Sequence, residues 1–228
     1  MRSAAGNDEI SPAALSRVRA IGLALAWLVV LLPSPGFAQD EEEDRLARAG
    51  SLGWVVGEAA APVTVVEFSD VSCPYCADFH AGTRAALIEE YVTSGGVRWI
   101  SLSYVSGLYR NSEALLVAAE CAGRQARYED FLDAAYKERD TWLRAPEGEL
   151  PPVVAGFVAD LELDGVAFEE CQGDPSVTER LDAVAKLARE AGVRGTPTWM
   201  VNGFPVMGAL PLDYARQFIE SQLDPGAR

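Results

Sequence analysis

Hydrophobic and polar residues alternate with two different periods along the chain, which separates β-type regions from helical ones. Residues 63–68 form a near-continuous β-branched run, typical of a buried central strand, and residues 97–104 alternate as a second strand. Residues 52–56 are expected to form a short additional strand. Between the two longer strands, apolar residues recur at helical spacing from Phe79 to Tyr91. Strand, long helix and strand predict a βαβ unit with a right-handed crossover.

The middle of the chain has only helical patterns, and β-type patterns return after it. Residues 111–189 contain several amphipathic segments, for which Ser112 and Asp164 are the expected caps, with a loop at 147–152. Thereafter Asn202-Gly203 is a strong hairpin signal. It predicts a hairpin of strands at 198–201 and 204–207, followed by a last amphipathic helix at 212–223.

Length and charge narrow the classes of protein to consider. The chain has 228 residues, enough for one domain or one domain with an insertion. Its 34 acidic and 19 basic residues give a net charge of −15. Without a basic stripe, the protein has no surface that could release counterions from nucleic acid, and its acidity disfavours anionic lipid headgroups. We therefore expect no nucleic-acid partner.

The first 38 residues are predicted to be an export signal. Arg17 and Arg19 precede the apolar run 20–32, and small residues follow up to Ala38. The run is shorter than the roughly 18 residues that span a bilayer, although an uncleaved membrane anchor is the alternative. Cleavage after Ala38 would leave an acidic segment, 39–60, with an expected disordered start. The mature chain would be periplasmic or extracellular, where disulfides persist.

Two cysteines, Cys73 and Cys76, follow the first long strand at a spacing of two residues. Such a pair can close a reversible disulfide, supply half of a metal site, or pack as small apolar groups. Their position favours the disulfide. Pro74 suits the first turn of a helix, and Ser72 is the expected cap. Cys73 would then lie at a helix N-terminus.

A helix N-terminus favours negative charge, so it stabilises a thiolate. We therefore expect Cys73 to be an exposed, ionised, attacking sulfur. Cys76 lies one turn further along and is expected to be covered. The pattern predicts a nucleophile with a resolving thiol beside it.

A second motif, Gly195-Thr196-Pro197-Thr198, places a proline at the start of a predicted strand. A cis Thr196–Pro197 bond would present the backbone of Thr196 beside the active sulfurs. An ordinary trans proline that opens an edge strand is the alternative.

Residues 66–76 (VEFSDVSCPYC) and 192–203 (GVRGTPTWMVNG) together resemble the DsbA-like family of exported thiol–disulfide oxidoreductases. The resemblance extends over nearly all of the mature chain. It implies an α/β protein with a thioredoxin fold, formed by residues 61–106 and 190–228. A helical domain, residues 107–189, would be inserted between the two parts.

The same resemblance implies roles for four residues. Cys73 would be the nucleophile, Cys76 the resolving thiol and Pro197 the cis-proline. Glu67 matches the family's buried acid, which carries protons to the resolving thiol. A charge inside an apolar strand needs a reason, although a strand-end carboxylate in water is the alternative.

Pro74, Tyr75 and Thr196 are expected to shape the substrate groove. The dipeptide between the cysteines departs from the family prototype, which has Pro-His where this chain has Pro-Tyr. Tyr75 cannot supply the positive charge with which a histidine helps to stabilise the thiolate. We therefore expect a weaker oxidant than the prototype, and the direction of electron flow stays open.

The other two cysteines, Cys121 and Cys171, lie in two predicted helices of the inserted region. In an oxidising compartment they would most simply pair with each other. Some DsbA-like proteins carry such a structural bridge, which supports the pairing. Two separate buried thiols are the alternative.

His80 is the only histidine of the chain, four residues after Cys76. Cys73, Cys76 and His80 could look like three metal ligands, but a closed zinc site needs a fourth, and none is near in sequence. We therefore expect no metal, and interpret His80 as a helix-surface residue that could tune the thiolate.

These observations predict an exported, monomeric enzyme that exchanges disulfides with protein thiols and needs no organic cofactor. By the family resemblance, a membrane protein would reoxidise it. Three alternatives stay open: a reductase or isomerase of the same fold, a periplasmic metal carrier, and a non-catalytic interaction module.

Overall fold

The computed structural model describes residues 35–146 and 149–224. The chain divides into two units, residues 1–41 and 42–228, and the second holds all the sites discussed below. The charged leader and apolar run of the predicted export signal lie outside the described residues. Among the helices of the described segments, none is long and apolar enough to span a bilayer.

Within the described residues, five strands form one sheet in the order β1-β3-β2-β4-β5. β2 is central and pairs in parallel with β3, while β4 is antiparallel to both β2 and β5. The central strand, the βαβ unit and the hairpin at Asn202-Gly203 expected from the sequence are therefore confirmed. The strands are β1 (Trp54–Val56), β2 (Val63–Ser69), β3 (Val97–Ser103), β4 (Thr198–Val201) and β5 (Phe204–Met207).

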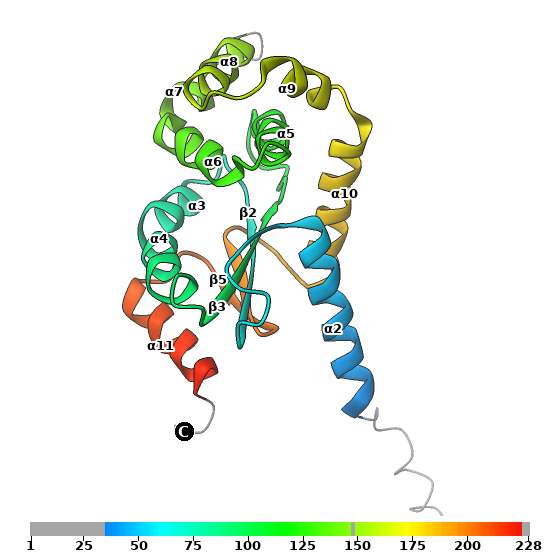
Figure 1. Cartoon of the computed structure of the whole chain (residues 1–228), viewed down its shortest axis with the longest axis vertical. Coiled ribbons are helices and arrows are strands. Elements are labelled where there is room, and N and C mark those ends of the chain that lie inside the picture. Colours follow the sequence, from blue (N-terminus) through cyan, green and yellow to red (C-terminus); the bar gives the residue numbers. More distant parts are fainter. Residues whose placement is uncertain (1–34, 147–148, 225–228) are drawn as a thin grey trace, which may run out of the picture. The chain divides into compact units, whose positions relative to one another are not determined.

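Helices precede the sheet, connect its strands and follow it (Figure 1). The bounds are α2 (Pro35–Leu52), α3 (Pro74–Phe79), η1 (His80–Arg84), α4 (Ala85–Leu87), η2 (Ile88–Val92), α5 (Ser112–Gly123), α6 (Tyr128–Lys137), α7 (Arg139–Leu143), α8 (Leu150–Asp160), α9 (Gly165–Gln172), α10 (Pro175–Glu190) and α11 (Leu212–Leu223).

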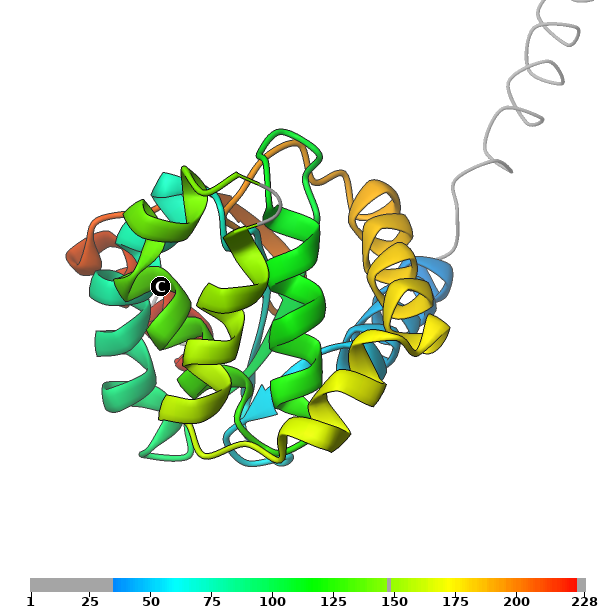
Figure 2. The same ribbon diagram turned by 90° about the horizontal axis from the view of Figure 1, so that it is seen from above.

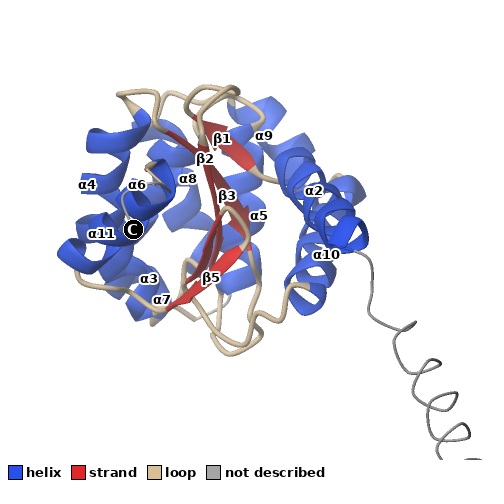
Figure 3. Ribbon diagram, turned by 90° about the horizontal axis from the view of Figure 1, so that it is seen from below, coloured by secondary structure: helices blue, strands red, loops and turns tan. Residues whose placement is uncertain are grey.

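The two faces of the sheet are covered by different helices (Figure 3). Because side chains of a strand alternate, Val63 and Val65 of β2 join one hydrophobic cluster, with residues of α3, α4 and α11. Val66 and Phe68 join another cluster, with residues of α2 and α10. Polar residues at the end of β2 that share the parity of Val65 therefore lie on the α3 side of the sheet.

The helix after the cysteines is a single run, but it is not a regular α-helix. Two π-helical turns, η1 and η2, interrupt it. Phe79 and Leu87 are buried as their spacing predicts. Each π turn inserts a residue into the helical repeat, which simple periodicity does not reveal.

Helices α5 to α10 lie between β3 and β4 in the sequence, so the expected helical insertion is present (Figures 1 and 2). They form their own hydrophobic cluster around Phe131 and Trp142. Only the first part of α10 belongs to this cluster, because Val184, Leu187 and Ala188 pack against the sheet instead. The long α10 thus connects the insertion to the sheet.

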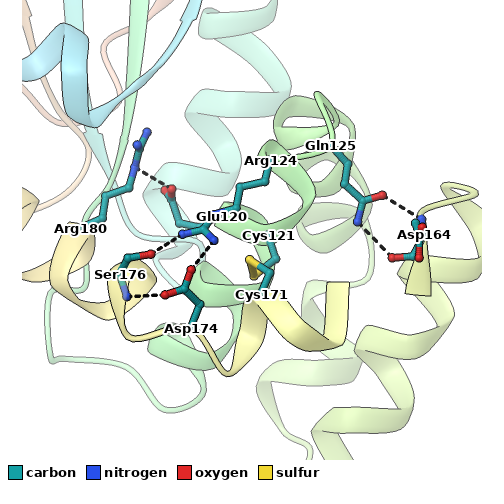
Figure 4. The surroundings of a disulfide bond; sticks show 9 residues. All are labelled: Glu120, Cys121, Arg124, Gln125, Asp164, Cys171, Asp174, Ser176 and Arg180. Carbon is teal, nitrogen blue, oxygen red and sulfur yellow. Dashed lines mark hydrogen bonds and ion pairs between the residues drawn. A yellow bond between two sulfur atoms is a disulfide. The ribbon is translucent and has the colours of Figure 1, made fainter. Parts of the chain in front are cut away.

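A disulfide joins Cys121 of α5 to Cys171 of α9 (Figure 4), with Cα atoms 5.7 Å apart. The expected pairing is therefore confirmed, and the alternative of two separate thiols is wrong. Close by, Arg124 forms an ion pair of 2.7 Å with Asp174. The side chain of Asp174 caps α10, so the same corner of the insertion has covalent and polar links.

The acidic residues 40–44, expected to be disordered, lie in helix α2 instead. Glutamate, alanine and arginine are good helix formers, and Arg48 forms an i, i+4 ion pair of 3.0 Å with Asp44. Ala49 is buried against the sheet, and Arg48 also contacts Glu190 of α10 at 2.6 Å. Tertiary contacts thus order a segment whose charge suggested disorder.

Two cap assignments and one loop differ from expectation, while Asp164 caps α9 as predicted. Cys73 itself, rather than Ser72, occupies the N-cap position of α3, and Asn111 rather than Ser112 precedes α5. Both serine hydroxyls are engaged in tertiary hydrogen bonds.

Residues 150–152, expected in a loop, begin α8, where prolines fit the first turn. Residues 147–148 lie outside the described residues.

Candidate redox site

Cys73 and Cys76 both carry free thiols at the start of α3. The backbone of Cys73 is extended at the N-cap position, and Pro74 occupies the first helical turn. The Ala77 N–H donates to the carbonyl oxygen of Cys73 at 3.1 Å, which closes that turn. The predicted position of Cys73 at a helix N-terminus is therefore confirmed.

The expected exposure of Cys73 is wrong, because only 1% of the residue is accessible to solvent. Its Sγ lies 3.3 Å from the carbonyl oxygen of Thr196. The side chain of Tyr109, from the loop between β3 and α5, also interacts with this sulfur and lowers the pKa of its thiol. Tyr109 in turn lines a cavity of about 1020 Å³ at α5, α8 and α9. Two segments distant in sequence thus cover the sulfur.

The contacts of Cys73 lower the pKa of its thiol from 9.0 to about 5. The largest cause is a hydrogen bond from the Cys76 thiol, and hydrogen bonds from the side chain of Thr196, the Cys76 backbone N–H and the side chain of Tyr109 add to it. Burial acts in the opposite direction. Since donors outweigh desolvation, Cys73 is a thiolate at neutral pH.

Cys76 has the opposite protonation behaviour. Burial raises the pKa of its thiol far above the ordinary value, and the adjacent Cys73 raises it further. Hydrogen bonds from the Ser69 hydroxyl and the Asp70 backbone N–H offset only part of this. Cys76 therefore keeps its proton at neutral pH, as a resolving thiol does.

The Thr196–Pro197 peptide bond is cis, so the trans alternative is wrong. Pairing of β4 with β2 places Thr198 opposite Phe68, which brings this segment to the end of β2. The backbone of Thr196 thus lies beside the active sulfur, as the sequence predicted. A pocket of about 200 Å³ is lined by residues 194–198 together with Met207 and Gly208.

Pro74 and Tyr75, the other two residues expected in the groove, are both exposed. Tyr75 has 64% of its surface accessible although its ring is large and apolar. The dipeptide between the cysteines therefore presents hydrophobic surface next to the buried sulfurs.

Asp70 is a site residue that sequence reasoning missed. Its side chain is fully buried and accepts hydrogen bonds from the Ser72 N–H at 2.9 Å and the Ser112 hydroxyl at 2.5 Å. Its second oxygen accepts from the Ser106 N–H at 3.0 Å. One carboxyl group thus ties the turn before Cys73 to the loop that carries Tyr109.

Glu67 is buried in β2, so a strand-end carboxylate in water is excluded. Its Oε2 accepts hydrogen bonds from Arg84 Nε and Trp99 Nε1, each at 2.9 Å. Arg84 also contacts Glu129 at 2.8 Å, so two carboxylates flank one buried guanidinium. Although burial opposes it, their charges together raise the pKa of Arg84, which stays protonated.

His80 is not a helix-surface residue, since only 7% of it is exposed. Its ring lies 4.6 Å from that of Tyr136, and its Nε2 lies 2.5 Å from Oδ1 of Asp133. Across the described residues, no group of three or more His, Cys, Asp or Glu side chains is arranged to hold a metal ion.

Some of the missed residues left a signal in the sequence. Cys76, His80 and Arg84 recur every four residues, and a polar stripe on an apolar helix face can indicate buried ion pairs. Asp70 begins the turn between β2 and Cys73, and an aspartate at the start of a turn commonly accepts backbone hydrogen bonds. We find no local signal for Tyr109, because its loop reaches Cys73 only in the folded chain.

Comparison with known families gives a match to the thioredoxin family over residues 51–221, which is most of the chain. The chain belongs to the thioredoxin family. Its sheet with an inserted helical segment is also the fold of solved DsbA-like proteins. Alpha-DsbA1 of Wolbachia pipientis superposes with a TM-score of 0.66, covering 86% of this chain and 95% of that one at 20% identity.

Two curated relatives illustrate the sequence similarity of this thioredoxin-family chain. Disulfide bond formation protein D of Bacillus subtilis is 25% identical over 177 residues, covering 74% of this chain and 76% of the relative. Na(+)/H(+) antiporter NhaA 1 of Salinispora arenicola is 33% identical over 150 residues. That match covers 65% of this chain but spans only 21% of the antiporter.

Proposed function

We propose that the chain is an exported protein thiol–disulfide oxidoreductase that introduces disulfides through Cys73 and Cys76. The observation that carries the proposal is the opposite protonation of two adjacent thiols, with the pKa of Cys73 lowered to about 5 and that of Cys76 raised. An ionised sulfur is a good nucleophile and a good leaving group, while its protonated neighbour waits to resolve what it captures.

In the oxidised enzyme, a substrate thiolate attacks Sγ of Cys73, and the bond to Cys76 breaks. Cys76 leaves with the electron pair and takes up a proton. A second substrate thiolate then attacks the substrate sulfur of the mixed disulfide, and Cys73 leaves as a thiolate. The substrate gains one disulfide, and the enzyme gains two electrons. A membrane redox partner would restore the enzyme disulfide.

The lowered pKa of Cys73 supports net oxidation, because a stable thiolate favours the reduced enzyme. A value of about 5 lies between the roughly 7 of thioredoxin and the roughly 3.5 of DsbA. We infer a potential between those of the two proteins, consistent with Tyr75 in place of a histidine. Titration of the Cys73–Cys76 pair in glutathione buffer tests this, and a midpoint at the thioredoxin end of about −270 mV would contradict it.

Four further residues are proposed to serve the same reaction. Pro197 and Thr196 would align the substrate backbone beside Cys73, supported by the 3.3 Å approach of Thr196 to the sulfur. Tyr75, with Pro74, would contact apolar residues around the substrate cysteine, supported by its exposed ring. Glu67 is proposed to influence protons at Cys76 from its buried position next to Arg84.

The proposed thioredoxin-like part, residues 61–106 and 190–228, would hold these groups, and the insertion 107–189 would cover them. The enzyme would act as a monomer on protein thiols. It would need no organic cofactor, since electrons pass directly between sulfur atoms.

Export is supported by two independent observations. The N-terminal 38 residues have the charged, apolar and small-residue segments of a signal. The Cys121–Cys171 disulfide would persist in an oxidising compartment such as the periplasm or the cell exterior. Fusion of residues 1–60 to a reporter enzyme that is active only after export tests this proposal.

Refolding of reduced ribonuclease tests the proposed activity. The protein, with catalytic amounts of an oxidant, should accelerate the recovery of ribonuclease activity, and a Cys73→Ser variant should not. Reduction of insulin without ribonuclease oxidation would instead identify a reductase. No activity in either assay would contradict an enzymatic role.

A further inference from the structure

Ser72, the residue before the proposed nucleophile, is fully buried, and each of its polar groups has a hydrogen-bond partner. Its N–H donates to Oδ1 of Asp70 at 2.9 Å, and its hydroxyl donates to the carbonyl oxygen of Arg110 at 3.4 Å. Its carbonyl oxygen accepts a hydrogen bond of 2.6 Å from Nη2 of Arg139. The peptide that leads into Cys73 is therefore held by a charged side chain from a distant part of the chain.

Arg139 begins α7, a short helix of the inserted region. Trp142 anchors this helix, because its fully buried ring joins the hydrophobic cluster of the insertion and its Nε1 donates to the carbonyl oxygen of Ala135 at 2.6 Å. The side-chain amide of Asn111 donates to the carbonyl oxygen of Trp142 at 3.0 Å. The guanidinium thus reaches the redox turn from a helix whose own position is fixed.

The positive charge of Arg139 has no carboxylate partner among the residues that the structure describes. Asp140, the next residue, pairs with Arg144 at 3.7 Å instead, and both of those side chains are exposed. Nε of Arg139 is buried and has no hydrogen-bond partner within the described segments. A neutral donor would satisfy the oxygen of Ser72 equally well, so the charge itself needs a reason.

The sulfur of Cys73 lies close to this charge. The carbonyl carbon of Ser72 is bonded to the nitrogen of Cys73, so bond lengths alone place Nη2 of Arg139 within about 10 Å of the sulfur. This is at most about one Debye length at physiological salt, and the hydrogen bond lies in a partly buried site where screening is weaker. A cation at this place attracts a thiolate appreciably.

The other titratable groups around the turn do not supply this charge. The carboxylate of Asp70 is fully buried and repels a thiolate. The thiol of Cys76 and the phenol of Tyr109 are neutral at pH 7, because the pKa of each is raised. Arg110 is exposed, so water screens its charge, and only its carbonyl oxygen is hydrogen-bonded to the turn. Arg139 is the cation that offsets Asp70.

We propose that Arg139 is a positioning residue that holds the peptide between Ser72 and Cys73 and stabilises the Cys73 thiolate by its charge. The inference rests on the proposed thiol–disulfide exchange. The reduced enzyme has a thiolate at Cys73 and a thiol at Cys76. When a disulfide oxidises it, the enzyme loses two electrons and the Cys76 proton, the sulfur–sulfur bond forms, and the charge at Cys73 disappears. Arg139 therefore stabilises the reduced enzyme selectively, which makes the enzyme disulfide a stronger oxidant.

Two titrations of the full chain test this proposal. Thiolate absorbance at 240 nm gives the pKa of Cys73, and equilibration in glutathione buffer gives the redox equilibrium constant. Arg139→Met should raise the pKa of Cys73 by about half a unit to one unit. At neutral pH it should shift the glutathione equilibrium about three- to tenfold toward the oxidised enzyme, because one pKa unit corresponds to a factor of ten. A purely structural defect would not move the two values in this ratio.

Three further variants separate the charge from the hydrogen bond. Arg139→Lys keeps the charge and should retain most of the wild-type pKa and equilibrium. Arg139→Gln keeps an N–H donor without the charge, should shift both values as Arg139→Met does, and replaces that variant if Arg139→Met does not fold. Arg144→Met, on the same helix but exposed, is the control and should change neither value.

Wild-type values in Arg139→Met or in Arg139→Gln would overturn the proposal. Shifts in Arg139→Lys as large as those in Arg139→Met would also overturn it, because the charge would then be irrelevant. A change in the redox equilibrium without a matching change in the pKa would assign Arg139 a structural role only. If Cys73 of the wild type titrated near the roughly 8.5 of free cysteine, the proposed function itself would be wrong, whatever the variants showed.

Discussion

The sulfur of Cys73 lies 3.3 Å from the carbonyl oxygen of Thr196, although 123 residues separate the two in sequence. The antiparallel pairing of β2 with β4 creates this contact, because the end of one strand meets the start of the other. Cys73, the proposed nucleophile, follows β2, and the segment proposed to align the substrate precedes β4, so two adjacent strands of one sheet position both groups.

Replacement of Cys76 should separate capture from resolution. In a Cys76→Ser variant the attacking thiol remains, but nothing nearby can displace the captured sulfur. We expect stable mixed disulfides between Cys73 and thiol substrates, detectable by mass spectrometry of the intact protein. The matched Cys73→Ser variant should form none. Equal trapping by both variants would contradict the assigned roles.

Tyr109→Phe should raise the pKa of Cys73. The phenol donates a hydrogen bond to the thiolate, and its loss should raise the value by about one unit at most, because Tyr109 is partly solvated. Thiolate absorbance at 240 nm against pH measures the change. Tyr75→Phe is the control, since that ring is mostly exposed. An unchanged titration in Tyr109→Phe would show that the phenol contact is unimportant.

Arg84→Met should destabilise the fold. The substitution leaves the buried Glu67, and the partly buried Glu129, without their shared counter-charge. Loss of one partner of a buried ion pair typically costs about 3–5 kcal/mol in the free energy of unfolding. Urea denaturation measures this loss. Arg216→Met, at an exposed ion pair with Glu90, should leave stability nearly unchanged. Equal urea midpoints for the two variants would contradict the proposal that Arg84 stabilises the fold through its buried ion pairs.

Removal of the structural disulfide should weaken the fold and spare the chemistry. Cys121 and Cys171 are 50 residues apart, for which the chain-entropy relation gives about 4 kcal/mol. The double Cys→Ser variant should melt at a lower temperature than the wild type. Its Cys73 should still react with iodoacetamide at the wild-type rate. A loss of that reactivity would show that the bridge also shapes the redox site.

Local sequence patterns predicted the parts of the fold that depend on neighbouring residues. The apolar run 63–68, the Asn202-Gly203 turn and the helix start at Pro74 each have a local cause. The approach of Thr196 to the sulfurs was also predicted, because two motifs were interpreted together. The pairing of Cys121 with Cys171 followed from the family resemblance and from elimination.

Features that depend on long-range contacts could not be predicted in the same way. Cys73 is buried because Tyr109 and Thr196 approach it from other parts of the chain. Ser72 caps nothing because its hydroxyl donates to the carbonyl oxygen of Arg110. Helix α2 is ordered by burial of Ala49, and charge alone suggested the opposite.

The pH dependence of Cys73 alkylation tests the central claim most directly. Reduced protein is treated with iodoacetamide across a range of pH, and the modified residue is identified by peptide mass spectrometry. Only the thiolate reacts, so reactivity should be retained at neutral pH and lost as the pH falls through about 5. A midpoint near the roughly 8.5 of free cysteine would contradict an ionised nucleophile at this site.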